Sequence, residues 1–128
     1  LKQKVVSGVD FLTTQMFFDN DIHYNFLYRI REAGINVPVL PGIMPMTSEK
    51  QMKRSQELSG TVFPRRFLAL LDRFGSSAAA MEQAGIAYAT DQIIDLLSNG
   101  VNNIHIYTMN KPHVAAAIMN NLSEIIKA

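Results

Sequence analysis

Three short apolar runs, each followed by segments with helical periodicity, narrow the choice of fold more than any other feature of this sequence. The runs begin at Phe11, Val37 and Ile104, and their composition is typical of buried strands. No hairpin signal joins one run directly to the next, so each connection is expected to cross over through helices. The strands are therefore predicted to run parallel, with right-handed crossovers, in a sheet covered on both faces.

The expected order of elements is β-α, β-α-α-α, β-α. We expect strands from Phe11, over Val37–Leu40 and over Ile104–Tyr107. The expected helices start at a cap on Asn20 or Asp21 and stop at Gly34, run from Ser48 to about Leu58, begin at Pro64, span about Ser77–Ser98 and follow a cap on Asn110. Gly85 is expected to weaken the long helix locally.

Two further segments carry specific expectations. The segment Pro41–Pro45 holds a glycine between two prolines, which predicts a rigid turn after the second strand. The residues Leu1–Lys4 resemble the last turns of a helix that ends at Gly8. This abrupt start leads us to expect that an upstream part of the protein is missing.

Length and composition limit the class of protein. The 128 residues fit one domain, and 48% hydrophobic with 18% charged residues argues against a disordered tail. A net charge of +1 without a basic stripe predicts no nucleic-acid partner. No apolar run approaches the roughly 18 residues of a membrane span. The absence of cysteine rules out disulfides and thiolate metal sites and fits a cytoplasmic location.

Ligands of parallel α/β folds bind beyond the carboxyl ends of the strands. That rule selects Thr14–Asp19, Pro41–Pro45 with the helix start that follows, and Tyr107–Lys111. None of the three contains a glycine-rich phosphate-binding fingerprint. Gln15 carries an acceptor and a donor on one planar head, so it can bind a heterocycle or a carboxamide, or alternatively a neighbouring backbone group.

The histidines give no catalytic or metal-binding pattern. We expect His105 to be a structural residue of the third strand. His23 and His113 are expected on helix surfaces, and the spacing of the three histidines supports no metal site.

Together, the segments Thr14–Asp19, Pro41–Pro45 and His105–Lys111 resemble the 5,10-methylenetetrahydrofolate reductase family in residue type, order and spacing. The family is a flavin-containing α/β protein with a (β/α)8 TIM barrel. The resemblance implies that residues 1–128 are the carboxyl-terminal half of one such domain, with its last three strands and their helices. A complete barrel takes about 250 residues. We therefore expect an amino-terminal half as partner, and a homo-oligomer.

The resemblance also implies a two-stage hydride transfer. NADH or NADPH reduces bound FAD, and the flavin then reduces 5,10-methylenetetrahydrofolate to 5-methyltetrahydrofolate. Gln15 matches a glutamine that contacts nicotinamide and folate in turn, and Gln51 matches a folate contact. Lys111 stands where a substrate-binding arginine is common, and Lys4, with Gln3, matches the end of the flavin-binding segment.

Some residues depart from the family pattern or allow a structural alternative. Ser55 stands where some members carry an aromatic residue against the folate, and Lys111 lacks the planar fork of arginine. Gln51 also fits a helix-capping role. No catalytic residue is assigned, because the acid that protonates the folate is expected upstream of Leu1; Asp19 could equally cap the helix that follows it.

Two other functions stay open. The chain could be a half-barrel that binds a partner and has no activity of its own. It could also belong to a related flavin-linked TIM-barrel dehydrogenase, such as the proline-oxidising enzymes, although the matched motifs favour the folate enzyme. In isolation, the chain is expected to be inactive.

Overall fold

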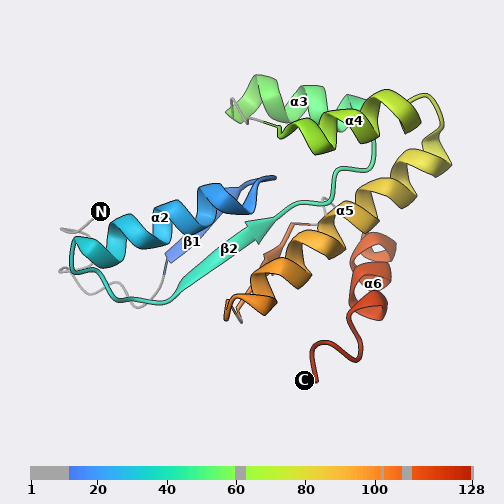
Figure 1. Cartoon of the computed structure of the whole chain (residues 1–128). Coiled ribbons are helices and arrows are strands. Elements are labelled where there is room, and N and C mark those ends of the chain that lie inside the picture. The colour runs from blue at the N-terminus through green and yellow to red at the C-terminus, as the bar shows by residue number, and fades with distance from the viewer. Residues whose placement is uncertain (1–11, 60–62, 102, 108–110, 128) are drawn as a thin grey trace.

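The computed structural model describes residues 12–59, 63–101, 103–107 and 111–127. Within these ranges the chain forms a three-stranded parallel sheet, with the strands in the order β1-β2-β3, and five helices (Figure 1). The predicted α/β class and the parallel strands are confirmed. The helix expected before Gly8 lies outside the described residues.

The elements follow the predicted order. The strands are β1 (Leu12–Met16), β2 (Val39–Ile43) and β3 (His105–Ile106). The helices are α2 (Asn20–Glu32), α3 (Glu49–Ser59), α4 (Arg65–Phe74), α5 (Ala78–Ser98) and α6 (Pro112–Asn121). Among the described residues, no helix combines the length and the hydropathy that spanning a bilayer requires.

The N-cap of α2 lies one residue before the first of the two predicted cap positions. Asp19, rather than Asn20 or Asp21, is the N-cap, and its carboxylate accepts the Asp21 N–H at 3.0 Å. The capping alternative for Asp19 is therefore confirmed. At the other end of the helix, Gly34 lies just beyond the C-cap and has a φ of +85°, a conformation that glycine adopts without strain.

Strand β2 continues past Leu40 to Ile43, so the rigid turn predicted for Pro41–Pro45 is partly wrong. Gly42 and Ile43 pair with the two residues of β3. Pro41 has no N–H to donate to a ladder. Proline is therefore tolerated at this position, which lies before the part of β2 that pairs with β3. The described pairing with β3 starts at Gly42.

Helices α3 to α6 form two groups around the sheet, and α2 lies apart from them beside β1 and β2 (Figure 1). Helices α3 and α4 lie beyond the C-terminal end of β2, whereas α5 runs back along the sheet with α6 beside it. The core between the sheet, α5 and α6 consists of the buried residues Phe17, Ile43, Ala89, Ile93, Leu96, Val114, Ile118 and Leu122. A second buried cluster, beyond the strand ends, is rich in methionine and phenylalanine: Phe18, Met44, Met46, Met52, Phe63, Phe67 and Met81.

Gly85 is buried where α5 crosses the segment that follows β2. A Cβ at this position would overlap the carbonyl group of Met46. The glycine, which we expected only to weaken the helix, thus lets α5 approach the backbone directly before Thr47. This close approach holds the segment that carries the candidate site.

Candidate functional site

The candidate site lies in the segments that follow β2 and β3. Thr47 belongs to the connection between β2 and α3, Gln51 to the first turn of α3, and Lys111 is the N-cap residue of α6. Gln51 and Lys111 are predicted site residues, and the structure brings them together. Thr47, which the sequence analysis missed, is the residue that joins them.

One chain of hydrogen bonds connects the three side chains. Lys111 Nζ lies 3.0 Å from Thr47 Oγ1, which lies 3.2 Å from Gln51 Oε1. The backbone N–H of Thr47 donates to the same Gln51 oxygen at 3.0 Å. Thr47 is 4% exposed, so this chain is anchored on a buried residue.

The helix-capping alternative for Gln51 is confirmed. Ser48 Oγ accepts the Gln51 N–H at 3.1 Å, as the first half of a capping box requires. The second half is shifted by one residue, because the Gln51 side chain returns to the N–H of Thr47 instead of that of Ser48. The amide nitrogen Nε2 is consequently the end of the side chain that is turned away from Thr47. Contact with a folate stays a prediction.

The positive charge at the site comes from Lys111. Within the described residues its ammonium group takes part in no ion pair, and its described partner is the uncharged hydroxyl of Thr47. A partly buried cation without a nearby carboxylate attracts anionic groups. Ser55, one turn further along α3 than Gln51, is buried.

Strand β1 has an irregularity at the predicted site residue Gln15. The register shifts between Thr13 and Met16, and the Thr14 hydroxyl accepts the Gly42 N–H at 2.9 Å. Such bulges redirect side chains and are frequent next to active sites. The Gln15 side chain, like Gln3 and Lys4 as a whole, lies outside the described part of the structure, so their predicted contacts stay predictions.

Tyr107, which follows β3, contacts residues of both other strands. Its ring crosses β2 at Gly42, where a Cβ would lie 2.6 Å from Tyr107 Cε2, and its hydroxyl donates to the Thr14 carbonyl at 3.3 Å. Gly42 is therefore needed for this crossing. In the sequence, a glycine inside one strand and an aromatic residue after the next would have been the signal.

Two side chains of α5 hold the residues that follow β1. The Tyr88 hydroxyl donates to the Phe18 carbonyl at 2.6 Å, and Gln92 Nε2 donates to the Phe17 carbonyl at 2.8 Å. Burial raises the pKa of Tyr88 above its usual value of 10.0. Residues four apart lie on the same face of a helix, so this pair was a readable signal that the sequence analysis missed.

The prediction of a surface position for His23 is wrong. Its side chain is 2% exposed and stacks on Phe17, with ring centroids 5.1 Å apart. Neither ring nitrogen has a hydrogen-bond partner among the described residues, and burial lowers the pKa of His23 below 6.5. The surface position predicted for His113 is confirmed, because its side chain is exposed. Its Nε2 lies 3.2 Å from Glu82 Oε1. His105 is exposed and packs edge-on against Tyr107.

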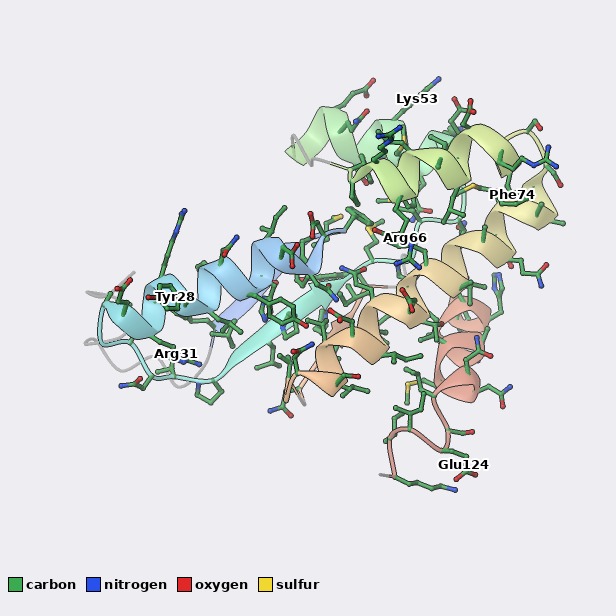
Figure 2. All side chains as sticks on the ribbon, in the orientation of Figure 1. Tyr28, Arg31, Lys53, Arg66, Phe74 and Glu124 are labelled. Atoms are coloured by element: carbon green, nitrogen blue, oxygen red, sulfur yellow. The ribbon has the colours of Figure 1, made fainter. Side chains whose placement is uncertain are left out.

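A separate cleft of about 530 Å³ lies between the start of α2, α4 and α5. Arg66 reaches across it from α4 (Figure 2) and pairs with Asp91 of α5 at 2.9 Å. Both side chains are more than half exposed. Neither Gln51 nor Lys111 lines this cleft, and the described residues contain no cluster of side chains that could hold a metal ion.

The fold and the strand-end residues define an α/β protein with a parallel sheet and a donor-rich polar site after β2 and β3. Residues 1–123 match the family model described as methylenetetrahydrofolate reductase. The chain belongs to the methylenetetrahydrofolate reductase family.

Curated relatives carry the same name. Methylenetetrahydrofolate reductase (NADH) 1 of Arabidopsis thaliana is 36% identical over 125 residues, which cover 98% of this chain and 21% of that protein. The 5,10-methylenetetrahydrofolate reductase of Escherichia coli is 32% identical over 122 residues, or 95% of this chain and 41% of that protein. This chain thus spans less than half the length of these relatives.

A solved structure shares the fold. It is an uncharacterised protein from Clostridium thermocellum, described as binding two copies of 5-methyl-5,6,7,8-tetrahydrofolic acid. The TM-score is 0.60 at 17% identity, and the match covers 97% of this chain and 46% of that one.

Proposed function

We propose that this chain takes part in the flavin-dependent reduction of 5,10-methylenetetrahydrofolate to 5-methyltetrahydrofolate in the cytoplasm, with NADH or NADPH as the reductant. The observation that carries the proposal is the hydrogen-bonded chain of Gln51, Thr47 and Lys111 at the strand ends of a member of this family. The structurally similar Clostridium thermocellum protein, described as binding a methylated tetrahydrofolate, supports a ligand of this class.

The described side chains fit a folate by their charge and by their hydrogen-bonding groups. Lys111 presents a positive charge, and Gln51 turns its Nε2 group away from Thr47. A folate carries glutamate carboxylates and a ring carbonyl, all of which accept hydrogen bonds. Gln15, at the irregular end of β1, is expected to contact the folate and the nicotinamide in turn.

The strand ends also fit a flavin. Met16, Met44 and Tyr107 form part of the apolar surroundings there, which suit a flat heteroaromatic ring. Gln3, Lys4 and Gln15 are the residues that we expect to hold the cofactor. When bound there, FAD would supply the hydride-transfer chemistry between the nicotinamide and the folate. The part of this chain is to orient the ligands and to shield them from water.

The full site requires more strands than the structure describes. Among the described residues, β1 and β3 each pair with one neighbour, so two sheet edges are open. In our proposal, further strands, from the same polypeptide or from a partner, complete a (β/α)8 barrel, and one of them carries the acid that protonates the folate. A homo-oligomer of complete barrels is the expected assembly.

A reconstitution tests the proposed function. The chain is prepared alone and together with the amino-terminal part of the Escherichia coli relative, and bound FAD and NADH-dependent reduction of methylenetetrahydrofolate are measured. We expect FAD retention and turnover in the mixture but not in the chain alone. A stable mixture that binds FAD, oxidises NADH and leaves the folate unreduced would refute the folate activity.

The open sheet edges also favour a second function, that of an assembly module without chemistry. In that case the two parts would form a stoichiometric complex by light scattering, yet the complex would neither retain FAD nor oxidise NADH. The two functions therefore differ in flavin content as well as in activity.

A further inference from the structure

We infer that Thr47 is a positioning residue: it turns the Gln51 amide so that only N–H donors face the ligand, and it holds the Lys111 ammonium beside them. This inference rests on the proposed function for the identity of the ligand, a folate. The orientation itself follows from the hydrogen bonds of the described residues.

The direction of the hydrogen bonds is fixed at both ends. The backbone N–H of Thr47 can only donate, so the Gln51 atom that faces it at 3.0 Å must be the oxygen. The Lys111 ammonium can also only donate, so Thr47 Oγ1 accepts from it at 3.0 Å. The hydroxyl hydrogen of Thr47 is then left for Gln51 Oε1, 3.2 Å away.

This arrangement uses the acceptor capacity of Gln51. Its oxygen receives the N–H and the O–H of the same threonine, whereas its NH₂ group points away from them. A ligand therefore meets N–H groups from Gln51 and from Lys111. A carboxylate or carbonyl oxygen pairs with these groups, and an amino group does not. Thr47 thus makes the site selective for acceptor groups of the folate.

The position of Thr47 is itself well supported. The side chain is 4% exposed, and the carbonyl of the preceding residue, Met46, is in close contact with Gly85 of α5. Rotation of the Thr47 backbone would break this contact as well as the bond to Gln51. The threonine is held by packing on one side and by hydrogen bonds on the other, as a residue that orients others needs to be.

The first experiment measures the chemical shift of the Thr47 amide proton by NMR. It uses the full 128-residue chain, alone and together with the amino-terminal part of the Escherichia coli relative. Gln51→Leu should shift the Thr47 amide proton upfield, whereas Gln51→Glu, which keeps an acceptor oxygen, should shift it downfield. Lys111→Met should perturb Thr47, and the exposed control Lys127→Met should not. A Thr47 amide that is unchanged by Gln51→Leu would overturn the inference, whether or not folate binds.

The second experiment uses the complex of this chain with the amino-terminal part of the Escherichia coli relative, and measures its affinity for 5-methyltetrahydrofolate. Thr47→Val removes the hydroxyl and keeps the shape, so we expect about tenfold weaker binding, with Thr47→Ser restoring most of it. Gln51→Glu should also bind about tenfold more weakly, because its second oxygen replaces the donor. Equal affinity of the Val and Ser variants would overturn the inference. If no variant binds folate while Thr47 still responds to Gln51→Leu, the inference stands and the proposed function fails.

Discussion

Gly85 on α5 and the carbonyl of Met46 lie so close together that the helix and the segment after β2 meet without a side chain between them. Two residues further along, Ser48 begins the cap of α3. The contact therefore sets how closely α5 packs against the segment that leads into α3. It also determines whether Gly85→Ala raises or lowers the free energy of unfolding.

Gly85→Ala is expected to destabilise the chain. Alanine gains about 1 kcal/mol in helix propensity, but its Cβ would collide with the Met46 carbonyl, and overpacking costs about 1–3 kcal/mol. Urea unfolding followed by circular dichroism gives the net effect. Ala87→Gly, at an exposed position of the same helix, measures the propensity effect by itself. A Gly85→Ala variant that is more stable than the wild type would contradict the contact.

Gly42→Ala is expected to displace the ring of Tyr107. The new Cβ would lie 2.6 Å from Tyr107 Cε2 and 2.8 Å from the Thr14 carbonyl oxygen, so the ring must move and lose its bond to that carbonyl. We expect a loss of about 1–3 kcal/mol for Gly42→Ala and of about 0.5–1.5 kcal/mol for Tyr107→Phe. Unfolding free energies of the single and double variants form a double-mutant cycle. Strict additivity would mean that Gly42→Ala leaves the Tyr107 hydrogen bond intact, contrary to the expected displacement of the ring.

Gln92→Leu tests the contact between α5 and the end of β1. The substitution keeps the size of the side chain but leaves the Phe17 carbonyl without its donor, at a cost of about 1–3 kcal/mol. Gln83→Leu, at an exposed position of the same helix, is the matched control and should change the unfolding free energy little. Equal effects of the two substitutions would show that the buried hydrogen bond contributes nothing.

His23 is expected to make the chain less stable in acid. Burial holds the folded-state pKa below 6.5, the value of the unfolded chain. The neutral form is therefore favoured by folding. Its contribution is present above pH 6.5 and is lost as the pH falls through the folded-state pKa. The unfolding free energy should decrease as the pH is lowered from 7.5 to about 5. His23→Phe should make this decrease smaller.

The control for this pH dependence is His113→Gln. His113 is exposed and lies beside Glu82, so its removal should leave the loss of stability in acid largely in place. An identical pH profile for the wild type and His23→Phe would assign the acid sensitivity to other groups.

The sequence predicted the elements and their order because helical and strand periodicities are local. It placed the end of β2 at Leu40, because proline and glycine are read as turn residues when the pairing partner is unknown. Gly42 continues the strand because it pairs with Met16 of β1 and with His105 of β3, which lies more than 60 residues away. The burial of His23 depends on the tertiary contact in which its ring stacks on Phe17, and the spacing of residues along α2 does not reveal this contact.

The candidate site was predictable in part. Gln51 and Lys111 were identified by resemblance, and the cap at Ser48 by a local pattern. Thr47 carries no local signal, since its role depends on a lysine 64 positions away. The contacts of Gln15, Gln3 and Lys4 stay predictions.

The crossing of Tyr107 over Gly42 has a consequence for the order in which the chain folds. The bond from Tyr107 to Thr14 joins residues 93 positions apart, and the bond from Lys111 to Thr47 joins residues 64 apart. Contacts of such long sequence separation form late, because the loops between them must be closed first. The helices can therefore form while the strand ends are still apart. During synthesis, the site can assemble only after Lys111 has left the ribosome.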